Sequence, residues 1–227
     1  IRMTINVPQF DLPVLTTAVR TNFILQPGVD LQLPELTRLD GSRVAAIDDQ
    51  IVNAPNLTEM VNTTLTLSGT GTFSPGTLTT IDLSRFILSD GATFSIPQSL
   101  TSYSSSGGMG VSERRTLFSV DGVGTVLDFS SLQTMSSVFS GLGGLLQLVV
   151  ASNGGTIDLT GLTTITGGGS GANGGGLLEF RVNAGSAINL SSLQTLIGDS
   201  AGILLTIAGN MQLGSSEVFV TRTQITT

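Results

Sequence analysis

The chain has 227 residues, a net charge of −7 and nine basic residues, all of them Arg. It contains no Cys, His, Trp or Lys, which excludes disulfides, thiolate or imidazole catalysis and Cys- or His-based metal sites. The negative charge argues against nucleic acid or an anionic membrane as a partner, and no apolar run approaches the length of a membrane span. Charged residues make up only 11%, and the chain has 29 Gly, which favours short strands and tight turns.

The first 110 residues carry a loose repeat: an aliphatic-polar-aliphatic triplet, then a corner. It occurs at residues 5–10, 31–39 and 52–60, with Pro at the corner. A further match begins at Ile81, but it lies too close to Phe94 for both to start a full rung. We therefore predict irregular rungs over residues 1–110 and leave the register of residues 65–103 open.

The repeat is clearer over residues 111–214. The inward residues Leu127, Ile157 and Ile188 recur about 30 residues apart. Each follows an alternating strand, beginning near Leu117, Leu146 and Leu178, and a Gly-bearing turn that needs the positive φ glycine supplies. Residues 204–213 repeat the pattern of strand, turn and strand, and residues 215–227 read as a further rung or a terminal strand.

A unit of this size cannot bury its apolar face alone and must stack on its neighbours. Equivalent aliphatics then form ladders through the core, with strands about 4.8 Å apart. We predict one all-β domain over residues 1–227, an elongated parallel β-solenoid (β-helix) with rungs of about 30 residues. Gly- and Ser-rich stretches at 104–113, 136–144 and 167–176 are predicted to be loops on one edge.

One outward position in the repeat is acidic or amidic. Stacking would place Asp128 and Asp158 on neighbouring rungs, followed by Asn189 and Gln212, with Asp82 in the further match. A calcium site bridging the rungs at Asp128 and Asp158 is the weaker hypothesis. The stronger one is that each side chain caps its corner by accepting a hydrogen bond from the backbone two residues later.

The residues give no sign of catalysis or of a cofactor. Asp48 and Asp49 are adjacent rather than opposed, as paired carboxylates would have to be for glycoside cleavage. We interpret Arg114 and Arg115, beside Glu113, as part of a solvated loop with a local salt bridge. Pairs of Thr fall at different points of the rung, so no flat Thr array of the ice-binding kind is expected. We predict that the protein is not an enzyme.

The segments 155–165 and 185–196 share the pattern of a Gly, one or two residues, then Ile-Asp/Asn-Leu-Ser/Thr with later aliphatics. This pattern resembles the tandem repeats of very long bacterial surface proteins, most of all planctomycete-type extracellular fibre or adhesin proteins. The resemblance covers residues 110–214 well and 1–110 loosely, and it implies an extracellular or cell-surface, self-associating protein. Residues 31–39 and 94–103 are also similar to bacterial leucine-rich repeats, without the downstream Ala-Phe and Cys.

We expect a structural function: a fibre subunit or adhesin stalk that assembles head-to-tail with other copies of itself. No capping helix is expected, so either the chain is part of a longer array or its end rungs stack on other copies. The residues expected to mediate self-association are near the two ends: Ile5, Val7, Phe10, Val218, Phe219 and Val220. The alternatives are a carbohydrate-binding or polysaccharide-cleaving β-helix, with surface glycans as partners, and a leucine-rich-repeat-like binding protein. Against the carbohydrate alternative, Tyr103 is the single Tyr.

Overall fold

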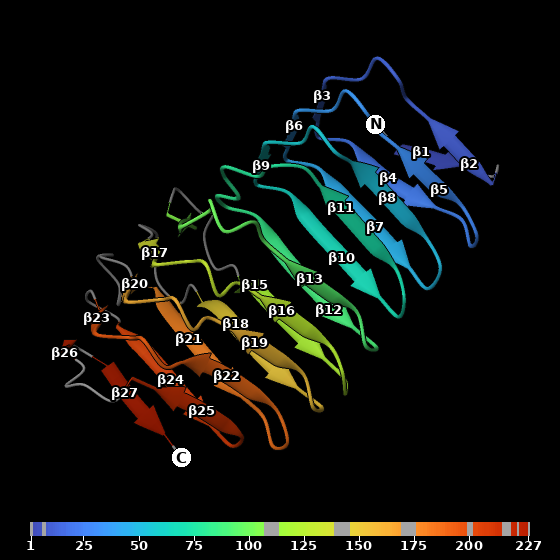
Figure 1. Cartoon of the computed structure of the whole chain (residues 1–227). Helices are drawn as coiled ribbons and strands as arrows, with labels where there is room; N and C mark the ends of the chain where they lie inside the picture. The colour runs from blue at the N-terminus through green and yellow to red at the C-terminus, as the bar shows by residue number, and fades with distance from the viewer. Residues whose placement is uncertain are drawn as a thin grey trace.

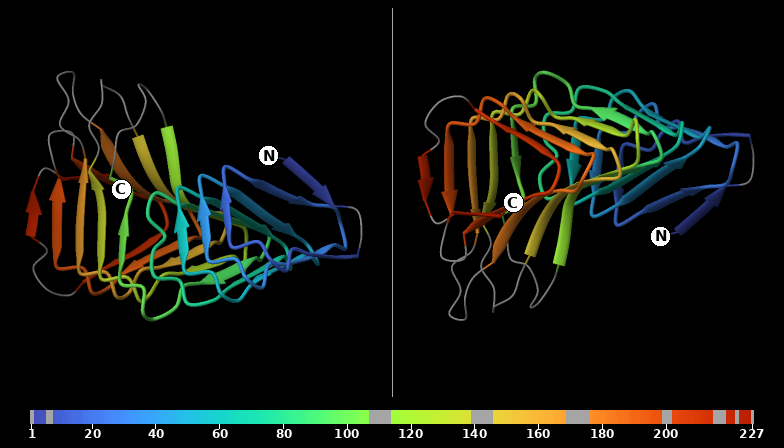
Figure 2. Two further views of the ribbon diagram at one scale, coloured as in Figure 1. Left: turned by 90° about the horizontal axis from the view of Figure 1, so that it is seen from above. Right: turned by 90° about the horizontal axis from the view of Figure 1, so that it is seen from below.

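The computed structural model describes residues 2–5, 8–106, 114–138, 146–168, 176–198, 202–214, 219–221 and 223–226, of which 2–5, 219–221 and 223–226 are described by their backbone alone. These residues form parallel strands and no helix. The strands build rungs that stack from the N-terminal to the C-terminal end (Figure 1), and the side-on views show equivalent strands lined up along the stack (Figure 2). The predicted parallel β-solenoid is confirmed.

The strands lie on three faces, and most rungs contribute one strand to each face. The first face is a single sheet that continues through every rung. Its strands, in order, are β1 (Arg2–Ile5), β4 (Asn22–Leu25), β7 (Arg43–Ile47), β10 (Thr64–Ser68), β12 (Arg85–Ser89), β15 (Arg114–Asp121), β18 (Leu146–Ser152), β21 (Leu177–Val182), β24 (Ile203–Ile207) and β27 (Thr223–Thr226).

The second face is divided into two sheets that are not hydrogen-bonded to each other. The first sheet contains β2 (Gln9–Asp11), β5 (Asp30–Gln32), β8 (Ile51–Ala54) and β11 (Thr72–Pro75). The second contains β13 (Thr93–Ser95), β16 (Val126–Asp128), β19 (Thr156–Asp158), β22 (Ala187–Leu190) and β25 (Asn210–Leu213).

The third face is also divided, but here hydrogen bonds bridge the division. Its first sheet contains β3 (Thr17–Val19), β6 (Arg38–Asp40) and β9 (Glu59–Val61). Its second contains β14 (Ser102–Ser104), β17 (Thr134–Val138), β20 (Thr164–Gly168), β23 (Thr195–Gly198) and β26 (Phe219–Thr221). Between the two sheets, the Asn62 N–H donates to the Asp82 carbonyl and the Leu83 N–H donates to the Ser104 carbonyl.

The rung length differs between the two halves of the stack. From β12 to β21 it is 30 to 33 residues, close to the predicted 30. From β4 to β12 it is a uniform 21 residues, so the irregular rungs predicted for residues 1–110 are wrong. The 21-residue period is hard to recognise in the sequence because the same triplet of inward, outward and inward residues occurs on all three faces.

Two segments of the first half lie on faces other than the predicted one. Ile81 and Asp82 belong to the third face, where Thr80 bridges Glu59, whereas Phe94 belongs to the second face and pairs with Leu127. The two segments therefore fit into one rung. The sequence pattern aligns Ile5 with Leu31, but Ile5 is the last residue of β1 on the first face. The residue that pairs with Leu31 on the second face is Phe10.

The core consists of the predicted aliphatic ladders. Leu127, Ile157 and Ile188 pair in register and are fully buried, and Met211 continues their ladder. Single aromatic rings, Phe23 and Phe180, are also buried in the core, and between β11 and β16 several rings gather at one level. There the rings pack against one another with centroids 4.9 to 6.4 Å apart. The cluster, called the aromatic junction below, comprises Phe73, Phe86, Phe94, Tyr103, Phe118 and Phe129.

Candidate functional site

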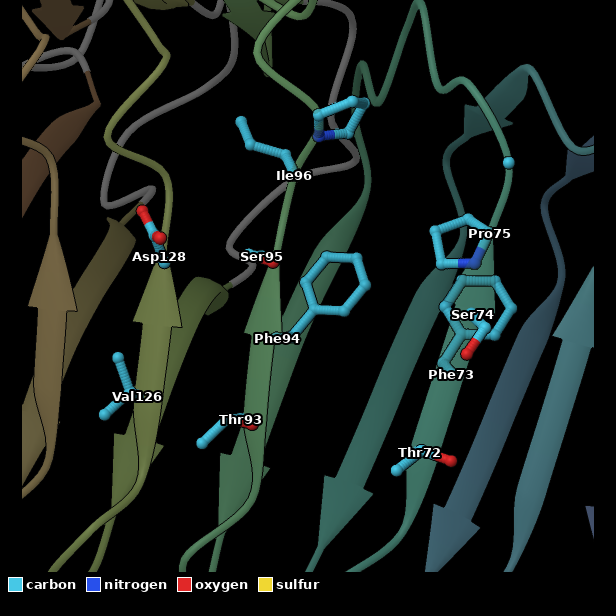
Figure 3. A pocket seen from close by; sticks show the side chains of 12 residues that line it. Thr72, Phe73, Ser74, Pro75, Thr93, Phe94, Ser95, Ile96, Val126 and Asp128 are labelled. Carbon is cyan, nitrogen blue, oxygen red and sulfur yellow. The ribbon is translucent and has the colours of Figure 1, made fainter. Parts of the chain in front are cut away.

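A depression in the described surface lies where the second face is divided, between β11 and β13. These strands occupy the same position in successive rungs, yet they are not hydrogen-bonded neighbours. The opening between them has a volume of about 760 Å³ (Figure 3). We call it the β11–β13 groove.

The groove has an apolar floor and a polar rim. Phe73, Phe94 and Ile96 form the floor; they are 6%, 5% and 8% exposed, whereas most core side chains are fully buried. The Phe73 and Phe94 rings are stacked with their centroids 6.2 Å apart. The rim consists of hydroxyl-bearing side chains that point outward from the two strands, together with the carboxylate of the next strand: Thr72, Ser74, Thr93, Ser95 and Asp128.

The backbone explains why the two strands do not pair. The Thr72 N–H donates to the Gln50 carbonyl just before β8, and the Gly76 N–H donates to the Ala54 carbonyl in β8. By alternation, the peptide groups of residues 73 and 75 therefore face the groove. Residue 75 is Pro, which has no N–H to donate. On the other side, Pro97 occupies the equivalent alternating position after β13, because the Ile96 N–H donates to β16. Proline at such edge positions prevents pairing with a neighbouring strand.

A second, smaller depression of about 320 Å³ adjoins the first along the chain. Pro97 and Asp128 line the first depression. Gln98 and Ser130, which follow them closely in the sequence, line the second. Its remaining lining residues are also polar or small: Ser131, Gln133 and Gly161. The two depressions therefore form a polar path that crosses from β11 toward the corner after β19.

The acidic column lies on the second face as predicted, with Asp128 opposite Asp158 and Asp158 opposite Asn189. Asp128 Oδ1 accepts from the Ser130 N–H at 3.0 Å, and Asp158 Oδ1 accepts from the Thr160 N–H at 2.9 Å. Corner capping is thus confirmed. Asp82 is not in this column; its Oδ1 accepts from the Ser104 N–H on the third face. No group of three or more acidic residues in the described parts of the chain could hold a metal ion.

The Thr pairs fall at different points of the rung, as predicted: Thr64 and Thr66 lie in β10 on the first face, whereas Thr72 lies in β11 on the second. Single Thr residues nevertheless form a column at one corner. Thr16, Thr37, Thr58 and Thr79 recur every 21 residues at the start of the third face. Each Oγ1 from Thr37 onward donates to the carbonyl of the preceding Thr at 3.0 to 3.2 Å. These hydroxyls therefore stabilise the stacking of the rungs.

The basic pair is not in a solvated loop. Arg114 and Arg115 lie in β15, and Arg115 Nη2 donates to Asn62 Oδ1 at 2.8 Å and to the Leu83 carbonyl at 2.7 Å. Arg115 thus connects the corners of two earlier rungs. Glu113, its predicted partner, lies outside the described residues.

Tyr103 is buried in the core of the aromatic junction, where its hydroxyl donates to the Ser84 carbonyl at 2.9 Å. Burial raises the pKa of the Tyr103 hydroxyl above its ordinary value. The side chain is therefore not accessible for stacking on a sugar.

The predicted self-association residues are in the end strands or beside them. Ile5 is in β1, Phe219 and Val220 are in β26, and Phe10 in β2 is partly buried against the core. Val7 and Val218 lie outside the described residues. The β11–β13 groove was not predicted from the sequence. Pro75 and Pro97 were the one local signal that could have indicated it.

No protein-family model, curated protein or solved structure matches this chain. Over the described ranges, no helix has the length and hydropathy required to cross a membrane.

Proposed function

We propose that the chain is a structural module of an extracellular or cell-surface assembly, a stalk or fibre segment that extends by end-to-end stacking of rungs. One observation carries the proposal: the first face is one parallel sheet from β1 to β27, in which every internal strand pairs on both sides. Within the described residues, β1 pairs only with β4, and β27 only with β24. A strand with one partner is a template for another strand.

The aliphatic ladders support the same function. They reach β25, where Met211 and Leu213 are only partly buried against the core. A further rung would complete their burial at roughly 25 cal/mol per Å² of apolar surface. That rung comes either from another copy or from more of the same polypeptide. Contacts of this head-to-tail kind do not close on themselves, so they produce filaments.

The test is the assembly state of the purified chain, measured by sedimentation velocity over a range of concentrations and by negative-stain microscopy. We expect rods that lengthen with concentration. Ile5→Lys places a charge in the end strand and should shorten the rods. Ile47→Lys is a control for the added charge alone, because Ile47 points outward from the same face within the stack and is 45% exposed. Monomers at all concentrations would overturn the stacking proposal.

A further inference from the structure

The structural function proposed above does not require the β11–β13 groove. A stack is strengthened by continuous pairing, yet here two strands in equivalent positions stay apart, with rings below and hydroxyls above. We infer that the groove binds a neutral oligosaccharide. The inference is independent of assembly, because the groove lies within the stack and not at its ends.

The dimensions exclude an inserted peptide strand. A strand placed between β11 and β13 needs about 9.6 Å between them, which is two strand spacings. Instead, Cα atoms of β11 and β13 lie within 8 Å of each other. In addition, Pro75 and Pro97 remove donors that a peptide would need from the two edges.

The charges exclude an anionic ligand. No Arg lines the groove, and the one charged group among its lining residues is the Asp128 carboxylate. A single carboxylate is also too few for a calcium site. Asp128 is without a second, opposed carboxylate in the lining, so the groove is suited to binding a glycan and not to cleaving it.

The balance of apolar and polar groups excludes a purely apolar ligand. The floor offers little surface, because its three side chains are at most 8% exposed. Covering the rim with an apolar group would bury the hydroxyls of Thr72, Ser74, Thr93 and Ser95 without partners, which is costly. A sugar ring has an apolar face for the floor and hydroxyls for the rim, and the volume is within the usual range for ligand sites.

The second depression indicates the direction in which a bound oligosaccharide would extend. It continues the polar lining from Pro97 to Gln98 and from Asp128 to Ser130, and it ends at Gly161. A glycan of several residues would follow this path along the stack. Its first ring would lie over Phe73 and Phe94 (Figure 3). Its later hydroxyls would reach the side chains of Gln98 and Gln133.

The test uses two arginine variants at matched positions. Thr93 lies on the rim, and Thr156 occupies the same column two strands away. Binding of cellohexaose, maltohexaose, xylohexaose and mannohexaose to the full chain is measured by calorimetry and by ligand-observed NMR, with hexagalacturonate as the acidic comparison. We expect at least one neutral hexasaccharide to bind, Thr93→Arg to weaken it by roughly tenfold or more, and Thr156→Arg to leave it unchanged.

Ser95→Ala removes one rim hydroxyl with little risk to the fold and should weaken binding by a smaller factor. Thermal melting of all three variants checks that they remain folded. The inference is overturned if no neutral hexasaccharide binds at millimolar concentration, if hexagalacturonate binds best, or if Thr93→Arg binds as well as Thr156→Arg. None of these results depends on whether the chain forms filaments.

Discussion

The two halves of the stack differ at one corner of the rung. In the first half, β6 ends at Asp40 and β7 begins at Arg43, so the chain turns from the third face to the first within two residues. In the second half, β17 ends at Val138 and β18 begins at Leu146. The other two corners change far less. A three-sided rung therefore needs three strands and two tight corners, while the third corner can take insertions of different length.

The tight corners of the first half depend on residues in the left-handed region. Arg20, Gly41, Asn62 and Leu83 form one column of positive φ, between 49° and 61°. Thr21, Ser42, Thr63 and Ser84 follow them directly as a buried column of hydroxyls. In this column the Ser42 and Ser84 hydroxyls accept from the N–H of the preceding rung, each at 3.1 Å. In the second half, a longer connection joins the third face to the first, as between Val138 and Leu146.

The aromatic junction lies where the two halves meet, and its removal should have the largest effect. Phe86 contacts three other rings, those of Phe94, Phe118 and Phe129. Phe86→Ala should lower the free energy of unfolding by about 4 kcal/mol, because it leaves a cavity in a fully buried site. It should also separate urea unfolding into two transitions, one for each half.

Leu65→Ala is the control for this prediction, since Leu65 pairs with Phe86 on the same face and is also fully buried. It should cost about 3 kcal/mol and leave a single transition. Two transitions in both variants, or in neither, would show that the junction does not couple the halves.

Close packing of the corners in the second half gives the next largest effect. A Cβ on Gly161 would lie 2.2 Å from the Ser130 carbonyl oxygen, and the backbone of the preceding rung cannot move away. Gly161→Ala should therefore cost about 3 kcal/mol in urea unfolding. Gly185 has positive φ but open space around its Cβ position, so Gly185→Ala should cost only about 1 kcal/mol. Equal losses would mean that backbone conformation, not contact between rungs, sets the requirement for glycine.

The sequence predicted the ladders of the second half because the strand pattern there recurs with a single period. The assignment of Leu127, Ile157 and Ile188 to one column needed only that period. It failed for Ile5 and Asp82 because the triplet of inward, outward and inward residues occurs on all three faces. Side-chain alternation shows which residues point inward, but not which face they belong to.

The β11–β13 groove could not be predicted for a related reason. Phe73 and Phe94 are in strands with the same alternation as strands that do pair. Whether two such strands form hydrogen bonds depends on the peptide groups between them, and those are almost identical for all residue types. Proline is the exception, so Pro75 and Pro97 were the only local sign. The groove forms where these prolines remove backbone donors and where the rings of Phe73 and Phe94 pack beneath the face. The second condition is a property of the stack, not of either strand alone.

A smaller effect tests the corner column of the first half. Leu83 has φ 61°, a conformation that is unfavourable for Leu and tolerated by Asn, which occupies the equivalent position 62. Leu83→Asn should raise the free energy of unfolding by about 0.5 kcal/mol. The reciprocal Asn62→Leu should lower it by more, because Arg115 also loses its acceptor. Destabilisation by Leu83→Asn would show that packing of the half-buried Leu outweighs the backbone strain.

The smallest expected effect depends on pH and concerns the corner after β12. Ser68 Oγ donates to Asp90 Oδ2 at 2.7 Å, and hydrogen bonds from Ser68 and then Ser89 lower the pKa of Asp90. Because the folded pKa is below the unfolded value of about 3.9, the stabilisation is complete above that value and is lost as the pH falls through the folded pKa. Asp90→Asn keeps a residue that tolerates the positive φ of 56° and removes the charge. The melting temperature of the variant should therefore fall less between pH 7 and pH 3 than that of the parent chain. Ser68→Ala, which removes the donor and keeps the carboxylate, should reduce the same pH dependence; an unchanged profile in both variants would place the acid sensitivity elsewhere in the stack.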